Sequence, residues 1–173
     1  MYIQVPNIVP LDNILPDEPL LMMGAGPVPI PAKVASANSI VINHLGNTMA
    51  QIIEQVKAMS RYVFQTESQH ILGVAGPGSA AMEMAIVNLI QPDDKVLSIC
   101  NGFFSSRLAE MATRSQANVQ RYVVPNGEFA DVTEVARLLA EFQPKVLTIV
   151  QGETSNTVFN RSLPEICLLA KKH

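Results

Sequence analysis

The sequence predicts an α/β protein with a mostly parallel sheet flanked by helices. Short apolar segments such as 95–100 (KVLSIC) and 145–150 (KVLTIV) alternate with longer segments of helical periodicity. Strands that alternate with helices in this way are typical of βαβ units, whose parallel sheet is covered on both faces. A helix predicted at 79–91 has Glu83 as its only charged residue, so we expect it to be buried on most of its sides.

Residues 1–30 differ in composition from the rest and are predicted to form an extended arm. Proline recurs there, and because proline fixes φ and has no N–H to donate, regular sheet or helix is disfavoured. Apolar residues from Leu20 to Met23 lie among the prolines, so we expect the arm to pack on its own domain or on a second subunit. The chain is therefore divided into this arm and an α/β part at 31–173.

The α/β part is predicted to begin with two helices, at 32–42 and 47–60. In the second helix, apolar residues recur at steps of three and four from Met49 to Met59. Strands are then predicted at 71–75, 95–100, 119–124 and 145–150, and helices at 79–91, 104–116, 132–142 and 162–172. Open α/β sheets bind ligands at the carboxyl ends of their strands, so the loops that follow the strands are the candidate site.

Length and charge exclude several classes of protein. A chain of 173 residues with 48 % hydrophobic residues is long enough for one folded domain and too apolar for a disordered one. Twelve basic and fifteen acidic residues leave a net charge of −3, which provides no basic surface for nucleic acid. The apolar runs are too short to span a membrane, and the N-terminus lacks the basic segment of a signal peptide.

The two cysteines indicate the cellular compartment. Cys100 and Cys167 lie in unrelated stretches, with no CxxC motif and no nearby pair of histidines. Such cysteines form neither a disulfide framework nor a metal site, and they are typical of a reducing environment. We therefore expect a soluble, cytoplasmic protein without a bound metal.

The first candidate loop, Gly76–Ser79, leads into the helix predicted at 79–91. Glycine permits close backbone approach, Ser79 can cap the helix, and the free N–H groups of a helix start suit a phosphate. The alternative is a tight turn with a serine cap. Gly76, Gly78 and Ala81 also match a dinucleotide fingerprint, but Asn101 stands where that site requires a ribose-binding acid, which favours a single phosphate group.

Two further loops follow the strands at 95–100 and 145–150. Phe103 and Phe104 follow the first of these strands, and Phe104 either begins the core face of its helix or offers a face to a flat cofactor ring. The stretch 152–157 (GETSNT) is rich in hydroxyl groups, which either cap a turn or bind a ring hydroxyl or a carboxylate. Its Glu153 is a candidate base, although a lone acid in a loop is more often solvated.

Taken together and in order, these loops resemble a known family. The stretches GPGSAAMEMAIVNLIQPDDKVLSICNGFF, RYVVPNGEF and QGETSNTVFN resemble the N-terminal part of a class V aminotransferase, in the alanine/serine–glyoxylate aminotransferase group. The earlier LLMMGAGPVPIP and NHLG are similar to the opening segment of that family, so the resemblance extends from about Leu20 onward. It implies the N-terminal part of the large domain of a fold type I transferase that uses pyridoxal 5′-phosphate (PLP).

The resemblance also implies a reaction and a set of site residues. The reaction moves an amino group from a small amino acid of the alanine or serine type to glyoxylate or a similar 2-oxo acid, in a homodimer. The implied cofactor-binding residues are Gly78 and Ser79 for the phosphate, Phe104 for the ring and Thr154 as a hydroxyl contact. The implied substrate-binding residues are Gly26 and Asn156, the latter where the family usually continues Ser-Thr-Gly.

Other residues that the family requires have no counterpart here. The Schiff-base lysine, the aspartate partner of the pyridinium nitrogen and the arginine for the substrate carboxylate are expected beyond His173, and none of the six lysines matches a family motif. The catalytic residues are therefore unknown, and we expect an incomplete, inactive portion of an aminotransferase. A non-catalytic partner-binding module and a nucleotide-binding Rossmann-type domain are the alternatives.

Overall fold

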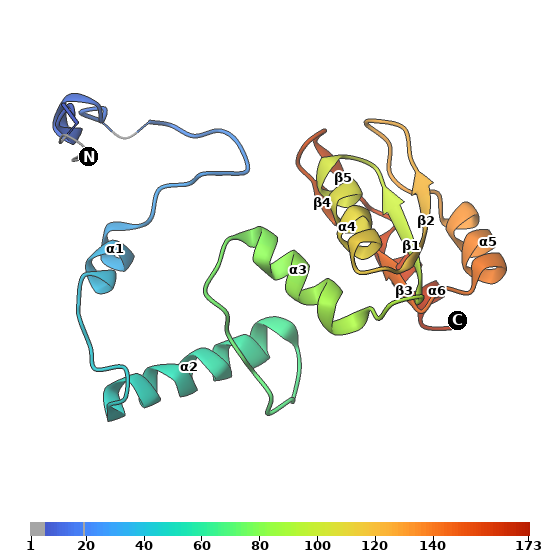
Figure 1. The fold of residues 1–173 in the computed structure, drawn as a ribbon, viewed down its shortest axis with the longest axis horizontal. Coiled ribbons are helices and arrows are strands. Elements are labelled where there is room, and N and C mark those ends of the chain that lie inside the picture. The colour runs from blue at the N-terminus through green and yellow to red at the C-terminus, as the bar shows by residue number, and fades with distance from the viewer. Residues whose placement is uncertain (1–5, 19) are drawn as a thin grey trace, which may run out of the picture. The chain divides into compact units, whose positions relative to one another are not determined.

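The structure, a computed structural model, describes residues 6–18 and 20–173. The chain divides into two units, Met1–Leu72 and Gly73–His173, each of which is described by itself. Figure 1 shows the ribbon with its elements labelled. No helix in the described part of the chain is long and apolar enough to cross a membrane.

The described residues of the first unit form three helices, and no residue of these helices is buried. They are the 3₁₀ turn η1 (Leu11–Asn13), α1 (Ala32–Asn38) and α2 (Asn47–Phe64). Helix α1 ends earlier than predicted, since the Ser39 hydroxyl donates to the Ser36 carbonyl and closes its last turn. The apolar stripe of α2 is present but exposed, with Ile52 at 42 % and Met59 at 59 %.

The second unit is an α/β fold. Its elements are α3 (Gly78–Leu89), β1 (Lys95–Cys100), α4 (Phe103–Arg114), β2 (Asn118–Val123), α5 (Val132–Phe142), β3 (Val146–Thr148), β4 (Gly152–Glu153), β5 (Val158–Phe159) and α6 (Leu163–Ala170). Strand β1 lies in the middle of a three-stranded sheet of order β2-β1-β3, and both pairings are parallel. The predicted parallel sheet flanked by helices is thus confirmed.

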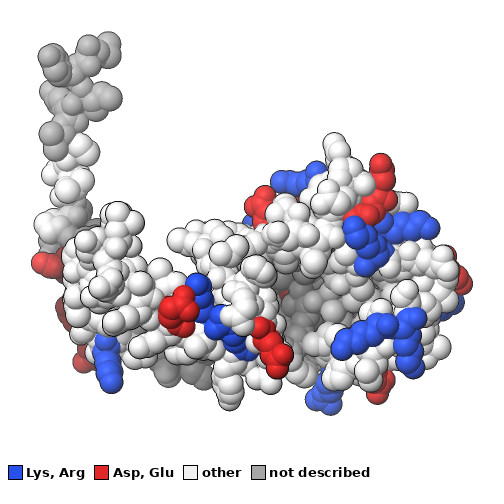
Figure 2. All heavy atoms as spheres, turned by 90° about the horizontal axis from the view of Figure 1, so that it is seen from below, with Lys and Arg blue, Asp and Glu red and all other residues white. Residues whose placement is uncertain are grey.

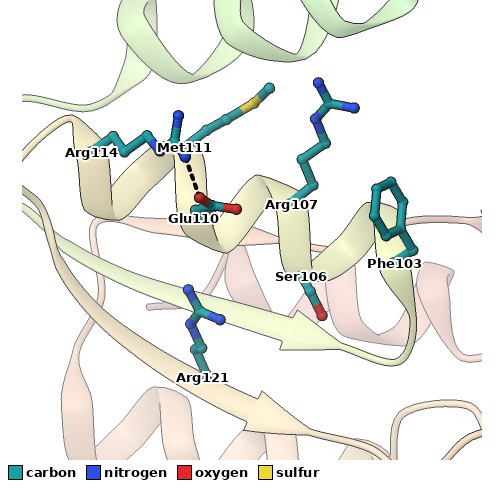
Figure 3. A pocket seen from close by; sticks show the side chains of 7 residues that line it. All are labelled: Phe103, Ser106, Arg107, Glu110, Met111, Arg114 and Arg121. Atoms are coloured by element: carbon teal, nitrogen blue, oxygen red, sulfur yellow. Dashed lines mark hydrogen bonds and ion pairs between the residues drawn. The ribbon is translucent and has the colours of Figure 1, made fainter.

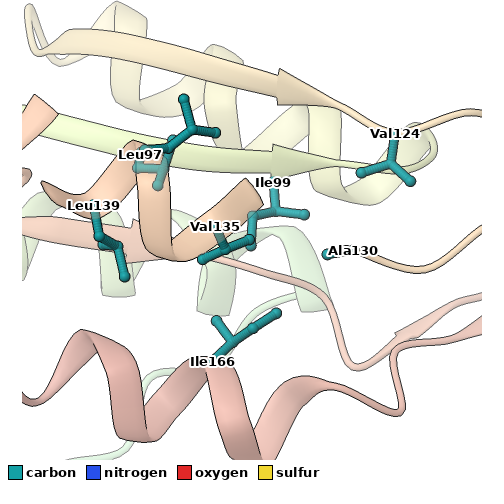
Figure 4. Close-up of a cluster of buried hydrophobic side chains, with 8 residues drawn as sticks. Leu97, Ile99, Val124, Ala130, Val135, Leu139 and Ile166 are labelled. Atoms are coloured by element: carbon teal, nitrogen blue, oxygen red, sulfur yellow. The ribbon is translucent and has the colours of Figure 1, made fainter. Parts of the chain in front are cut away.

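The core lies on both faces of β1, whose residues from Val96 to Cys100 are all buried. Leu97 and Ile99 point to the face covered by α5 and α6, where they join Leu139 and Ile166 (Figure 4). Val96 belongs to a second cluster with Ile86, Ile90 and Ala112 from the opposite face. Because successive strand residues face opposite sides, a strand that is apolar throughout must be covered twice.

Two predictions for the segment before β1 are wrong. Residues 71–75 form no strand, and Leu72 and Val74 are 88 % and 68 % exposed, because no described segment pairs with them. A β-propensity alone does not make a strand, since its N–H and C=O groups need a neighbouring ladder. Helix α3 was expected to be buried on most sides, yet only Ile86 of its residues is buried and Val87 is 52 % exposed.

Beyond β3 the chain forms a small hairpin that the sequence did not predict. Strands β4 and β5 pair antiparallel, with Glu153 opposite Val158, and the residues between them form the turn. Thr157 adopts φ +60° at the end of this turn. The hairpin brings residues 152–157 back toward the start of α4, where the candidate site lies.

Figure 2 shows how charged side chains are distributed on one face of the protein. Figure 2 shows Lys and Arg side chains scattered with Asp and Glu across a mainly uncharged face. This distribution agrees with the net charge of −3.

Candidate functional site

The centre of the candidate site is a buried carboxylate at the start of α4. Glu153, on β4, is 0 % exposed. Its Oε2 accepts from the backbone N–H of Ser105 at 2.8 Å and from the Ser105 hydroxyl at 2.9 Å. Its Oε1 accepts from the Phe104 N–H at 3.3 Å and from the Ser155 hydroxyl at 2.7 Å. The carboxylate therefore caps the first turn of α4, whose own N-cap residue offers no side chain.

The hydroxyl of Ser155 extends this cap. It accepts a hydrogen bond from the Phe103 N–H at 2.9 Å. Three successive backbone N–H groups at the start of α4 therefore donate to Glu153 or Ser155. We call Glu153 and Ser155 the α4 clamp. A negative charge is stabilised at a helix N-terminus by the helix dipole, which supports an ionised carboxylate here.

The pKa of Glu153 lies below its ordinary value. Burial alone would raise it, but the hydrogen bonds from Ser155, from Ser105 and from the Phe104 N–H outweigh burial. Hydrogen bonds that favour the charged form lower the pKa of a carboxyl. Glu153 is therefore neither the solvated loop acid nor the candidate base expected from the sequence, because its oxygens are already engaged in capping.

Gly102 makes room for the clamp. A Cβ built at this position would lie 2.3 Å from Cγ and 2.5 Å from Cδ of Glu153, and 2.6 Å from Oγ of Ser155. Any side chain at residue 102 would displace the carboxylate. The glycine between β1 and α4 is required by this close approach and not by its own backbone angles.

A second buried polar network ties the hairpin to the end of β1. Asn101 is fully buried, and its side-chain N–H donates to Oδ1 of Asn160 at 3.1 Å. The Asn160 side chain in turn donates to the Val150 carbonyl, and the Asn156 side chain donates to the Asn101 carbonyl. The Asn101 side-chain N–H is thus engaged inside the protein, while its buried Oδ1 has no hydrogen-bond partner among the described residues.

Asn156 and Thr154, both predicted site residues, lie in the β4–β5 turn. Thr154 is exposed, whereas Asn156 is half-buried and lines a pocket of about 520 Å³ together with Gly102 and Phe103. The Asn156 Oδ1 is buried and has no hydrogen-bond partner among the described residues. An unpaired buried acceptor is rare, so this oxygen is suited to receive a donor from a ligand or a water.

The same pocket reaches the end of β1. Cys100 lines it, and burial raises the pKa of the Cys100 thiol, so this cysteine is protonated at neutral pH. Val123 and Val124 supply apolar walls. The pocket lies where β1 and β2 end, which is the edge at which open α/β sheets bind ligands.

Gly78 and Ser79 are the first two residues of α3, but Ser79 does not cap the helix. Pro77 is the N-cap residue and Ser79 the second helical residue, so the expected serine cap is not formed. The Ala80 N–H bonds to the Pro77 carbonyl at 2.8 Å, and no hydrogen bond among the described residues uses the N–H groups of Gly78 or Ser79. These two groups are free to bind an anion.

Gly76, not Gly78, is the sterically required glycine of this loop. A Cβ at Gly76 would lie 2.9 Å from the Cβ of Ala80, while a Cβ at Gly78 meets nothing within 4 Å. The turn therefore packs tightly on the first turn of α3. Its helix N-terminus remains open.

Phe104 is the second residue of α4 and is 37 % exposed. The Phe103 ring stands edge-on to it, with centroids 5.3 Å apart and planes at 88°. Phe104 is thus neither a buried core residue nor a free surface ring. Its backbone is held by the α4 clamp.

A basic pocket along α4 was not predicted. Arg107 and Arg114 from α4 and Arg121 from β2 line a pocket of about 410 Å³ beside Phe103 (Figure 3). Arg114 pairs with Glu110, and Arg107 also lines a pocket with Ser79. The spacing of these α4 residues by three and four positions was a usable signal, since it places them on one helix face.

The structure brings some predicted residues together and leaves others apart. Phe103 and Asn156 line the pocket at the end of β1, and Ser79 lines a different pocket with Arg107. No hydrogen bond among the described residues joins Ser79 to Phe104. Gly26, with φ +156°, belongs to the first unit and is described only there. Within residues 6–18 and 20–173 there is no group of three His, Cys, Asp or Glu residues that could hold a metal.

Comparison with protein families gives one extended match. The family described as Aminotransferase class-V matches residues 32–173. Alanine–glyoxylate aminotransferase of Mus musculus is 39 % identical over 139 residues, which are 80 % of this chain and 34 % of that protein. (S)-ureidoglycine–glyoxylate transaminase of Bacillus subtilis is 30 % identical over 78 % of this chain and 32 % of that protein.

A solved structure has a similar fold. The alanine–glyoxylate aminotransferase of Nostoc sp. matches with a TM-score of 0.77 and 31 % identity, over 94 % of this chain and 45 % of that one. The chain therefore spans about a third of the length of the curated relatives named above.

Proposed function

Since the chain belongs to the class V aminotransferase family, we propose that it is the N-terminal part of the cofactor-binding large domain of a PLP-dependent aminotransferase. The reaction proposed is transfer of an amino group from a small amino acid of the alanine or serine type to glyoxylate or a similar 2-oxo acid. Residues 1–30 are its N-terminal arm and 31–173 its α/β part. The observation that carries the proposal is the pair of free N–H groups at Gly78 and Ser79, which follows the glycine loop in family order.

The residues present fit the phosphate of PLP. Gly78 carries no side chain, space around it is open, and its N–H and that of Ser79 have no acceptor among the described residues. Two aligned N–H groups at the positive end of a helix bind phosphate oxygens. By contrast, the N–H groups that begin α4 are used by Glu153 and Ser155, so of these two helices α3 is the one available for an anion.

The residues present also fit a flat ring. Phe104 is partly exposed, its edge-on neighbour Phe103 restricts its rotation, and the family resemblance assigns it the stacking position. Thr154 and Asn156 supply a hydroxyl and an unpaired amide oxygen from the β4–β5 turn. We propose that these groups and Gly26 contact the cofactor or substrate. PLP, when bound, supplies an electron sink for the α-carbon of the amino acid.

The lysines of this chain are not proposed as catalytic. Lys145 is paired with Asp94, and the Lys95 ammonium lies 5.4 Å from the Phe142 ring centroid. Lys95 is the first residue of β1 and Lys145 directly precedes β3, at the edge opposite the candidate site. The amine that completes the chemistry is therefore proposed to come from another part of the full-length enzyme.

We also propose a homodimer in the cytoplasm. Exposed apolar residues on α3, including Val87 and Leu89, support burial against further protein. Cys100 and Cys167 are both free, which supports a reducing compartment.

The proposal is tested on the protein translated from its whole natural reading frame. After loading with PLP, the protein should convert alanine and glyoxylate to pyruvate and glycine. The pyruvate formed is measured by coupling it to the oxidation of NADH. Serine replaces alanine in a second assay. Lys95→Met is the control that should retain the wild-type rate, because Lys95 lies at the amino end of β1. A protein that takes up no PLP and transfers no amino group from either donor contradicts the proposal.

A further inference from the structure

We propose that Glu153 is a positioning residue: it fixes the first turn of α4 and thereby orients the Phe104 ring for the cofactor. The inference rests on the proposed function, because it concerns the ring assigned to that cofactor. It goes further by assigning a role to a carboxylate that touches neither of the free N–H groups on α3.

The geometry leaves Glu153 few other roles. Both oxygens accept hydrogen bonds from Phe104 and Ser105 at the start of α4, at distances from 2.8 to 3.3 Å, and Oε1 also accepts from the Ser155 hydroxyl of the hairpin at 2.7 Å. The side chain is fully buried and comes from a hairpin forty-eight residues further along the chain than Ser105. A long-range contact of this kind sets where the helix begins, and local sequence cannot do so.

The clamp controls Phe104 through its backbone. The Phe104 N–H and the Ser105 N–H both donate to the Glu153 carboxylate, so the peptide groups on either side of the ring-bearing residue are fixed. The edge-on contact with Phe103 then restricts the ring itself. Stacking on a planar cofactor depends on ring orientation, and a loosened first turn would allow several orientations.

A single isosteric substitution separates this role from simple packing. In Glu153→Gln the side-chain volume is kept, but one oxygen becomes an NH₂ group that faces donors. Whichever way the amide is turned, a backbone N–H of α4 loses its acceptor, since each oxygen accepts one from Phe104 or Ser105. Glu141→Gln, on the exposed surface of α5, is the matched control.

The first measurement is amide hydrogen exchange in the full-length protein without cofactor. The amides of Phe104 and Ser105 should exchange about tenfold faster or more in Glu153→Gln, because a charge-assisted hydrogen bond is lost. The amides of Leu97 and Ile99 in β1 serve as the internal reference for global stability. Equal changes at both places, or no change at Phe104 and Ser105, would overturn the proposal.

The second measurement uses the protein loaded with PLP. Glu153→Gln should weaken PLP binding by about tenfold and reduce the visible circular dichroism of the bound cofactor, which reports its orientation. Glu141→Gln should leave both unchanged. Faster local exchange with wild-type affinity and dichroism would also overturn the proposal, since the clamp would then be structural only.

The two proposals fail differently. If the wild-type protein takes up no PLP, the proposed function is wrong, and with it the cofactor role of Phe104. The exchange experiment still decides whether Glu153 fixes the turn. If PLP binds and the exchange rates at Phe104 and Ser105 do not respond, only the positioning role is wrong.

Discussion

The Glu153 carboxylate occupies the space that a side chain at Gly102 would fill. The two residues lie fifty-one positions apart, yet a Cβ at Gly102 would come within 2.3 Å of Glu153 Cγ. This contact joins the loop after β1 to the β4–β5 hairpin. It explains why the start of α4 has a glycine and no capping side chain of its own.

Gly102→Ala should destabilise the protein by about 2 kcal/mol, because overpacking a filled site forces neighbouring atoms to move. Urea unfolding of the full-length protein measures the change. Gly152→Ala is the matched control, since a Cβ at Gly152 meets nothing within 4 Å. Equal stability of the two variants would show that Glu153 moves aside at little cost.

The contribution of Glu153 to stability should depend on pH. Its pKa in the folded protein is lowered by hydrogen bonds that outweigh burial, so its stabilisation is complete above the unfolded pKa of about 4.3. It is lost as pH falls through the folded pKa. At pH 7 we expect Glu153→Gln to be about 2 kcal/mol less stable than wild type.

The difference in unfolding free energy between wild type and Glu153→Gln should shrink as the pH falls below about 4. Urea midpoints between neutral and acid pH provide the measurement. The groups that bond the carboxylate, Ser105, Ser155 and the Phe104 N–H, do not titrate in this range. A difference that stays constant with pH would mean that the carboxylate is not the group responsible.

Gly78→Pro should weaken binding of PLP without unfolding α3. Proline is accepted at the first helical position and removes only the N–H proposed to hold the phosphate, and the preceding Pro77 is already extended at ψ 167°. A loss of about tenfold or more in affinity is expected for one hydrogen bond to a charged group. Fluorescence titration measures it.

Gly78→Ala is the control for this change, because it adds a carbon atom and keeps the N–H. Open space surrounds this position in the protein, so α3 should keep its stability. Equal loss of affinity in both variants would point to a steric effect and not to the missing donor.

Phe104→Leu should weaken PLP binding about fivefold, whereas Phe104→Trp should retain it, since stacking of an aromatic ring contributes about 1 kcal/mol beyond burial. Phe129→Leu, also exposed at 52 %, is the control without a proposed site role. Similar affinity for the leucine and tryptophan variants would remove the stacking role from Phe104.

Most of the α/β unit could be predicted from local patterns. The apolar strand at β1 and the helical periodicity of α5 were sufficient, because Val135, Leu138 and Leu139 recur on one face and Asp131 caps the helix through the Glu134 N–H. The segment 71–75 was predicted wrongly by the same reasoning. The apolar side chains of this segment are typical of a strand. Its backbone, however, has no neighbouring strand in the described chain with which to form hydrogen bonds.

Local sequence was enough to predict the parallel sheet, the glycine loop before α3 and the order of the three loops, since each depends on neighbouring residues and on their periodicity. The role of Glu153, which the sequence left as a candidate base or a solvated acid, follows from the fold alone. The reason is physical: whether a carboxylate is a base, a surface charge or a helix cap depends on which donors surround it. Here those donors come from a helix that begins fifty residues earlier.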